Sequence, residues 1–138
     1  MEKSSELRTG RSCVFAMHVH LVFVTKYRRK IFTKEILGHM RSIFSEICMD
    51  FECEMIEFDG EGDHVHLLIN YPPKVSVSKL VNSLKGVSSR LLRKHGYPSI
   101  QKSLWGDHLW SPSYFASSCG GAPIEILRKY IEEQRTPD

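Results

Sequence analysis

Two pairs of histidines in this sequence have the spacing of a metal clamp. In each pair one valine separates the histidines inside an apolar run, "AMHVHLVFV" from Ala16 to Val24 and "GDHVHLLI" from Gly62 to Ile69. Imidazole is a common metal ligand, and side chains two residues apart on a β-strand point to the same face. Either pair could therefore bind a metal ion, or could simply fill space on a strand.

The surroundings of the two pairs favour the second pair as the site. His64 and His66 follow a Gly/Asp turn directly, with Asp63 adjacent, so an open coordination position would be accessible there. His18 and His20 lie in the middle of their apolar run. We therefore interpret the first pair as packing residues, or as residues that orient the metal ligands, a role that His20 would fill.

Two residues near the C-terminus are further candidates for chemistry. Tyr130 and Gln134 stand four residues apart, and so on one face of an expected helix. They flank the apolar stripe formed by Ile124, Leu127 and Ile131. By themselves these residues allow a simpler interpretation, in which the tyrosine packs at the edge of the core and the glutamine is solvated.

Basic residues gather in two segments of the chain. "KYRRK", Lys26 to Lys30, includes a tyrosine, and "KGVSSRLLRKH" spans Lys85 to His95. Basic clusters with nearby aromatic residues suggest a polyanion partner, nucleic acid first. A solvated turn and a solvated helix face are the alternatives for the two segments.

The composition is that of one globular domain over residues 1–138. Hydrophobic residues make up 41% of the chain and charged residues 25%, with a net charge of +3, which excludes disordered and fibrous classes. No apolar run could span a bilayer, and the charged N-terminus lacks the apolar part of a signal peptide. The four cysteines are scattered, which favours reduced, mostly buried thiols. We expect a cytoplasmic protein without a membrane partner.

The periodicity of the apolar residues predicts the elements that position these candidates. The expected strands are 13–25, 51–59, 63–71 and 113–118, and the expected helices are 33–49, 76–94 and 122–134. A flexible leader is expected over residues 1–12, and a loop is expected from about residue 102 to the last strand. Gly120 and Gly121 would form a hinge before the last helix.

This order of elements predicts an α+β fold of the ferredoxin-like or RRM-like βαββαβ type. Two helices would cover one face of an antiparallel sheet, and an additional C-terminal helix would carry Tyr130. The apolar residues that alternate with the histidines would point toward the two helices, so both His-Val-His pairs would lie on the open face. Single-stranded nucleic acid often binds to that face in domains of this type. The last helix could cross the face or reach another subunit.

Several motifs together resemble the single-tyrosine HUH transposases of small bacterial and archaeal insertion sequences. They are "HLVFVTKYRRKIF", "DHVHLLI", "KGVSSRLLRK", "LWSPSYF" and "GGAPIEILRKYIEEQ", in the family order. The likeness runs from about Val14 to Gln134, nearly the whole chain. One departure is Val19, which stands where the family often has an aromatic residue in its first strand.

The resemblance implies a role for each candidate residue. His64 and His66 would bind a divalent metal ion, Mg²⁺ or Mn²⁺, with Gln134 as third ligand and Glu133 or Asp63 as alternatives to it. Tyr130 would cleave single-stranded DNA at hairpin-bearing ends of an insertion sequence through a 5′-phosphotyrosine, and a 3′-hydroxyl would rejoin the strand. Such strand transfer needs no ATP, in keeping with the lack of a G-x-x-x-x-G-K-[ST] motif.

The resemblance also implies partners. The expected assembly is a homodimer with composite active sites, in which the tyrosine helix serves the partner's histidines in trans. The expected partner is single-stranded DNA with hairpins. The residues expected to bind it are Lys26, Tyr27, Arg28, Arg29, Lys30, Lys85, Arg90, Arg93 and Lys94.

Three other functions are compatible with this sequence. A domesticated relative would process chromosomal repeat hairpins by the same chemistry, and a metal-dependent phosphodiesterase would use water in place of Tyr130. A non-catalytic RRM-like module would only bind single-stranded nucleic acid. Such a module usually carries aromatic residues on its open face, where this chain is expected to carry histidines.

Overall fold

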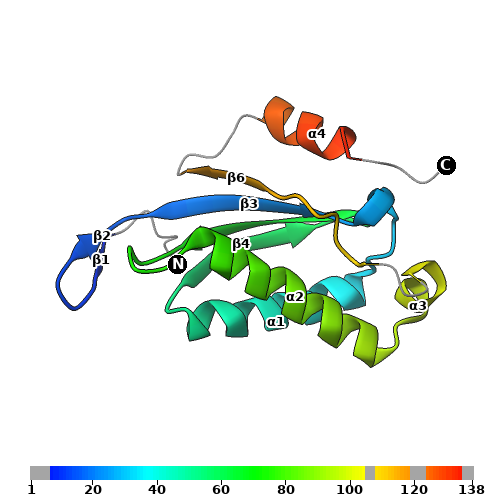
Figure 1. Cartoon of the computed structure of the whole chain (residues 1–138), viewed down its shortest axis with the longest axis horizontal. Coiled ribbons are helices and arrows are strands. Elements are labelled where there is room, and N and C mark those ends of the chain that lie inside the picture. The colour runs from blue at the N-terminus through cyan, green and yellow to red at the C-terminus, as the bar shows by residue number, and fades with distance from the viewer. Residues whose placement is uncertain (1–6, 105–107, 119–123, 135–138) are drawn as a thin grey trace.

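The computed structural model describes residues 7–104, 108–118 and 124–134, which form a four-stranded antiparallel sheet with helices on both faces (Figure 1). The strands are β3 (His18–Val24), β4 (Glu54–Gly60), β5 (His64–Asn70) and β6 (Phe115–Ser118), in the order β4-β5-β3-β6. All neighbours are antiparallel. The predicted α+β fold with its antiparallel sheet is confirmed.

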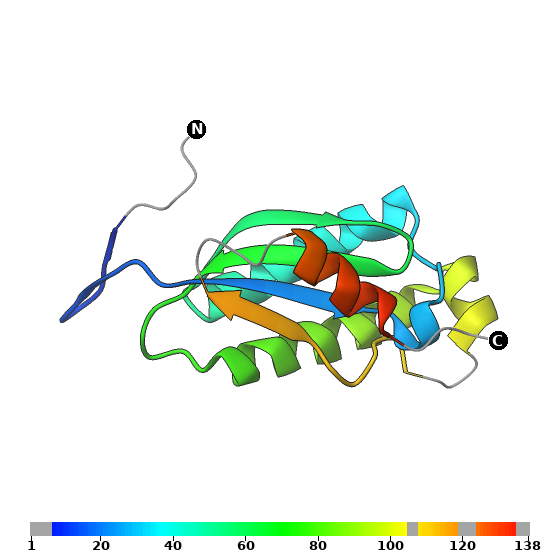
Figure 2. The same ribbon diagram turned by 90° about the horizontal axis from the view of Figure 1, so that it is seen from above.

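The helices are divided unequally between the two faces of the sheet. Helices α1 (Lys34–Asp50) and α2 (Val77–His95) pack side by side beneath it, whereas α4 (Ile124–Glu132) lies over the opposite face (Figures 1 and 2). A short 3₁₀ helix, η1 (Lys26–Arg28), follows β3, and α3 (Pro98–Leu104) follows α2. The face expected to be open is thus partly covered by α4.

The core lies between the sheet and the two long helices. It is built by alternation, because every second residue of a strand points to the same face: Val19, Leu21 and Phe23 of β3 are buried there. Both helices begin at a hydroxyl cap, since Thr33 accepts from the backbone N–H of Ile36 and Ser76 accepts from that of Lys79.

The N-terminal part of the chain differs from the prediction. Residues 8 and 9, expected in a flexible leader, form β1 (Arg8–Thr9), which pairs with β2 (Val14–Phe15) in a separate hairpin. The Arg8 guanidinium ties this hairpin to the sheet by donating to the backbone and side-chain oxygens of Asn70. The strand expected over 13–25 is therefore split, and Cys13, expected to be buried, is exposed.

Two further differences concern α2 and the segment after it. A helix, α3, forms where a loop was expected from residue 102, because Ile100 and Leu104 can reach the core from its first and last turns. On α2, Ser88 and Leu92 are fully buried in place of the expected Val87 and Leu91, which are partly buried. The predicted Leu80 and Leu84 are buried, and the buried stripe continues at intervals of four residues to Ser88, which accepts a hydrogen bond from the Trp110 indole at 3.0 Å.

Among the helices of the described residues, none is long and apolar enough to cross a membrane.

Candidate active site

The histidines of β5 lie on the face of the sheet that is turned away from α1 and α2. His64 pairs with Val24 and His66 with Val22 across the antiparallel ladder. Both side chains are partly exposed, whereas the alternating Val65 is fully buried. The period of two along the strand thus brings both imidazoles to one accessible surface, as the sequence predicts.

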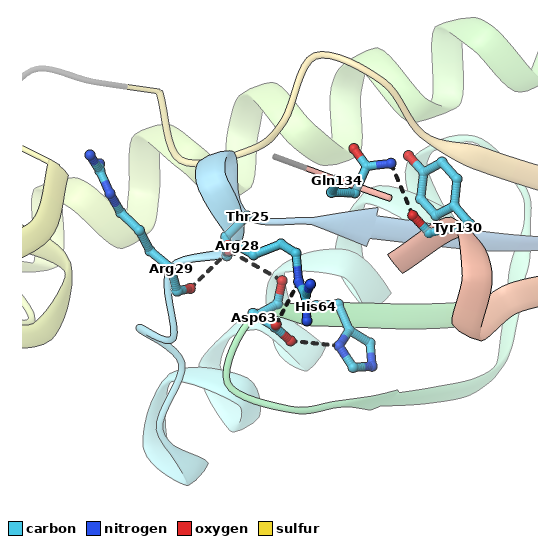
Figure 3. Close-up of polar contacts among 7 residues, drawn as sticks. All are labelled: Thr25, Arg28, Arg29, Asp63, His64, Tyr130 and Gln134. Carbon is cyan, nitrogen blue, oxygen red and sulfur yellow. Dashed lines mark hydrogen bonds and ion pairs between the residues drawn. The ribbon is translucent and has the colours of Figure 1, made fainter. Parts of the chain in front are cut away.

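A carboxylate fixes the ring of His64. Its Nδ1 lies 2.8 Å from Oδ1 of Asp63 (Figure 3). Because an ionised carboxylate can only accept, Nδ1 must donate, and in the neutral ring this leaves the lone pair on Nε2. A neutral imidazole held by a carboxylate in this way is the usual arrangement of a metal-binding histidine. The donor set of His64 and His66 therefore fits a divalent metal ion.

Of the two histidines of β3, only His20 packs beside this site, because His18 pairs with Asn70 farther along the sheet. His18 is buried, and its Nε2 lies 3.4 Å from Nδ2 of Asn70. The His20 ring meets the His66 ring edge to face, with centroids 5.7 Å apart. Burial lowers the pKa of His20, the nearby His66 lowers it further, and Glu57 opposes the shift. His20 thus supports His66 from the side as a neutral ring.

Tyr130 lies on the same face of the sheet but over a different strand. Its ring packs on Phe115 of β6 with centroids 5.6 Å apart. Phe115 pairs with Val22, and Val22 with His66, so Phe115 and His66 are separated by two strand spacings, roughly 10 Å. In Figure 3 the Tyr130 ring extends away from His64. The tyrosine and the histidines share a surface without touching.

A serine holds the hydroxyl of Tyr130. The Ser113 hydroxyl lies 2.8 Å from it. Burial raises the pKa of Tyr130, and the hydrogen bond to Ser113 opposes this rise. The phenol is therefore protonated near neutral pH in this arrangement.

Gln134 is held by the same segment as Tyr130. Its amide oxygen accepts from the hydroxyls of Ser111, at 3.1 Å, and Ser113, at 3.3 Å, and its amide nitrogen donates to the Tyr130 carbonyl at 3.1 Å. Glu133 is exposed. Within the residues that the structure describes, no three His, Cys, Asp or Glu side chains are grouped to hold a metal ion. The expected hinge at Gly120 and Gly121 lies outside these residues.

Residues 13–134 match the family of IS200-like transposases. This chain belongs to that family. It is 33% identical over 129 residues to the ISDra2 transposase TnpA of Deinococcus radiodurans, which covers 94% of this chain and 91% of the relative. It is 31% identical over 119 residues to the transposase of insertion sequence IS200 from Salmonella typhimurium, covering 86% and 77% of the two chains.

Two solved structures share the fold of this chain. A putative transposase from Deinococcus radiodurans superimposes with a TM-score of 0.85 and 28% identity, over 94% of this chain and 99% of the other. A REP-associated tyrosine transposase bound to a REP hairpin superimposes with a TM-score of 0.58 and 11% identity, over 91% and 68%. The second likeness shows the fold alone.

The sequence analysis missed the residues that hold the tyrosine helix of this transposase. Lys85 of α2 donates from Nζ to the carbonyl of Ser111, at 2.7 Å, and to that of Ser113, at 3.1 Å. Burial lowers the pKa of Lys85. This lysine, expected to bind DNA, thus fixes the segment whose serines hold Tyr130 and Gln134. The motif "LWSPSYF" contains both serines but gives no sign of this role.

Three of the remaining expected DNA-binding residues line a pocket, whereas Arg28 faces Asp63 and the Arg29 guanidinium donates to the Ser103 carbonyl. The pocket, of about 570 Å³, lies between α2 and residues 108–112, and Lys26, Arg90 and Arg93 line it together with Lys85. In η1, the charged groups of Lys26 and Arg29 lie 5.4 and 5.2 Å from the centre of the Tyr27 ring. The exposed members of the set are Lys30, Arg90 and Lys94.

Proposed function

We propose that this transposase cleaves and rejoins single-stranded DNA at hairpin-bearing ends of an insertion sequence, through a 5′-phosphotyrosine at Tyr130. The observation that carries the proposal is the arrangement on the upper face of the sheet. His64, held by the Asp63 carboxylate, and His66 lie on the face that α4 covers. Tyr130 comes from α4, whereas Gln134 lies two residues beyond the end of that helix, which was expected to extend to residue 134. Family membership gives this arrangement its reaction class.

The proposed chemistry conserves the energy of the phosphodiester. The Tyr130 oxygen attacks the scissile phosphorus, loses its proton, and becomes linked to the 5′-phosphate while the 3′-oxygen leaves and takes up a proton. A second 3′-hydroxyl reverses the step on a different strand and frees the tyrosine. A free phenol, with a pKa near ~10, is a weak nucleophile, and the raised pKa of Tyr130 makes activation at the site necessary.

His64, His66 and Gln134 are the proposed ligands of a divalent cation. Such an ion would neutralise charge on the scissile phosphate and align it for in-line attack. Imidazole ligands suit Mn²⁺ better than Mg²⁺, which prefers oxygen. For Gln134 to contribute its amide oxygen, it must first leave Ser111 and Ser113. Asp63 is occupied with Nδ1 of His64 and orients that ligand instead.

We further propose that the active site is completed in trans in a homodimer. Two strand spacings separate Tyr130 from His66 within one chain, and Ser113 holds the phenol. Exchange of α4 between subunits would place Tyr130 over the partner's histidines. A mixture of His64→Ala and Tyr130→Phe chains should then recover cleavage, because it rebuilds one intact site. No recovery from mixed dimers would exclude catalysis in trans.

Hairpin DNA is the proposed substrate for two reasons. One structural relative is bound to a REP hairpin, and the exposed Lys30, Arg90 and Lys94 offer phosphate contacts beside a basic pocket. Unpaired bases could stack on aromatic residues of the basic turn, of which Tyr27 is one.

The decisive experiment is a test for a covalent adduct. Labelled single-stranded hairpin DNA from the flanks of the gene is incubated with the protein and Mn²⁺ or Mg²⁺, and the products are separated on a denaturing protein gel. A labelled protein band that requires metal, His64 and Tyr130 is expected. Tyr114→Phe is the matched control, because it removes a partly buried tyrosine hydroxyl elsewhere in the chain and should leave the band intact.

Other outcomes would assign the chain differently. Cut DNA without an adduct would indicate hydrolysis by water, and binding without cleavage would indicate an RRM-like module. An adduct formed with chromosomal repeat hairpins, but not with hairpins from the element's ends, would indicate a domesticated relative.

A further inference from the structure

We propose that Arg28 is a positioning residue for His64, acting through Asp63, and that it does not serve mainly as a phosphate contact. This inference rests on the proposed function, because His64 matters here as a metal ligand. It gives Arg28 a different role from the other residues of the basic segment Lys26–Lys30. The sequence alone offers no reason to separate these five residues.

The Asp63 carboxylate bridges the two side chains. Its Oδ2 lies 3.5 Å from Nε of Arg28, and its Oδ1 lies 2.8 Å from Nδ1 of His64 (Figure 3). The side chains of Asp63 and His64 are only 10% and 16% exposed, and that of Arg28 is 25% exposed. A carboxylate so far removed from water requires a nearby positive charge, and Arg28 supplies it.

The direction of the Arg28 side chain supports this role. Its Nε atom is buried and has no hydrogen-bond partner among the described residues, so the charge there faces Asp63 and not solvent. Lys30, two residues along the same turn, is exposed. A phosphate could approach Lys30 freely, whereas the Nε side of Arg28 is closed to it.

The backbone conformation of the basic turn directs the Arg28 side chain toward Asp63. Tyr27 and Arg28 have φ angles of 61° and 54°, in the left-handed region that non-glycine residues rarely adopt. Thr25 holds this turn, since its hydroxyl donates to the Arg29 carbonyl at 2.8 Å and its backbone N–H donates to the Asp63 carbonyl at 2.9 Å. Strain of this kind persists where the surroundings enforce it, and it is common at functional sites.

The consequence concerns the nitrogen that His64 presents. While Asp63 accepts from Nδ1, the Nε2 lone pair is the one available to a cation. Without Arg28, a buried carboxylate would lose its compensating charge and turn toward water, and the His64 ring would lose its anchor. Arg28 therefore links the DNA-facing turn to the geometry of the metal ligand.

Calorimetric titration of the full chain with Mn²⁺, in the absence of DNA, tests the proposal. Asp63→Asn should weaken binding by about 10- to 100-fold, the range for residues that orient metal ligands. Arg28→Gln should weaken it by about tenfold or less, and adding it to Asp63→Asn should cause no further loss. Lys30→Gln is the matched control, because it removes a positive charge from the same turn and should leave Mn²⁺ affinity unchanged.

A second, metal-free measurement separates this proposal from the proposed function. In ¹⁵N-histidine NMR spectra, His64 of the wild-type chain should be the Nδ1–H tautomer, and Arg28→Gln should raise the share of the other tautomer, whereas Arg28→Lys should have a smaller effect. Thermal unfolding checks that each variant is folded. If Mn²⁺ binding in the wild type is absent or survives His64→Ala, the proposed metal site is wrong, and the tautomer shift alone decides the role of Arg28.

The opposite result would overturn the proposal. If Arg28→Gln leaves both the Mn²⁺ affinity and the His64 tautomer unchanged, Arg28 does not position the ligand. If it also flattens the salt dependence of hairpin binding as much as Lys30→Gln does, Arg28 is a phosphate contact after all.

Discussion

The hydroxyl of Tyr130 lies 2.8 Å from the hydroxyl of Ser113, and the amide oxygen of Gln134 accepts from the same serine. One segment of the chain thus holds both residues that the proposed chemistry needs at the histidines. Lys85 holds that segment in turn, by its hydrogen bonds to the carbonyls of Ser111 and Ser113. The position of the tyrosine helix is therefore coupled to α2, on the far side of the sheet.

The first prediction concerns the acidity of the nucleophile. Ser113→Ala should raise the pKa of Tyr130, because the hydrogen bond between the two hydroxyls opposes the rise that burial causes. NMR titration of ring-labelled tyrosine measures this, with Tyr130→Phe identifying the signal. The exposed Ser118→Ala serves as control and should cause no change. An unchanged or lower pKa in Ser113→Ala would show that the serine does not stabilise the phenolate.

A second prediction concerns the buried hydrogen bond between α2 and Trp110. Ser88→Ala removes the acceptor of the indole N–H, at 3.0 Å, and leaves that donor buried and unpaired. The free energy of unfolding should fall by about 1–3 kcal/mol, measured by urea denaturation. Ser89→Ala, one residue along and less buried, should cost far less. Equal losses in the two variants would mean that the hydrogen bond does not set the effect, because replacing serine by alanine raises helix propensity at both positions.

A third prediction follows from two buried thiols. Burial raises the pKa of Cys48 from 9.0 to about 12 and that of Cys53 from 9.0 to about 11. Because the folded chain holds these protons more tightly than the unfolded chain, their contribution to stability is complete below pH 9 and is lost as the pH rises toward 12. Urea denaturation at several pH values should show this decline.

The matched control for that decline is the Cys48→Ala/Cys53→Ala chain. Other groups titrate in the same range, so the comparison uses the difference in slope between the two chains, which should be steeper for the wild type. Parallel curves would mean that the thiols ionise as readily in the folded chain as in the unfolded chain. In the wild type, a maleimide reagent at pH 7 should modify the exposed Cys13 and spare Cys48 and Cys53.

The sheet and its faces could be predicted from the sequence because they follow from local periodicity. Val65, Leu67 and Ile69 alternate with His64 and His66, and a period of two leaves only one way to bury the apolar set. The same logic worked for β3 only from His18 onward. Before it, the alternation of Cys13 and Phe15 continues although these residues follow the turn of the β1–β2 hairpin, and Gly10 and Ser12 are the only local signals of that turn.

The contacts that orient the candidate site could not be predicted in this way. The segment with Ser111 and Ser113 meets Lys85 of α2 and Tyr130 of α4. The positive φ angles of Tyr27 and Arg28 occur at residues that carry no glycine signal. Such features depend on which segments become neighbours in the fold, and residue spacing along one element does not contain that information. The role of Asp63 could be predicted in part. Its place next to His64 in the sequence suggested that it supports this histidine, but not that Arg28 lies at its other carboxylate oxygen.

The last prediction separates phosphate contacts from structural cations among the expected DNA-binding residues. Lys30 and Lys94 are exposed, whereas Lys85 is committed to two carbonyl oxygens. If both exposed lysines meet phosphates, Lys30→Gln/Lys94→Gln should flatten the slope of log affinity for hairpin DNA against log salt by about 1.5. Lys85→Gln should leave the slope unchanged and instead lower the thermal stability. Fluorescence anisotropy over a salt series measures the slope, and a flatter slope for Lys85→Gln alone would show that DNA binding draws Lys85 away from Ser111 and Ser113.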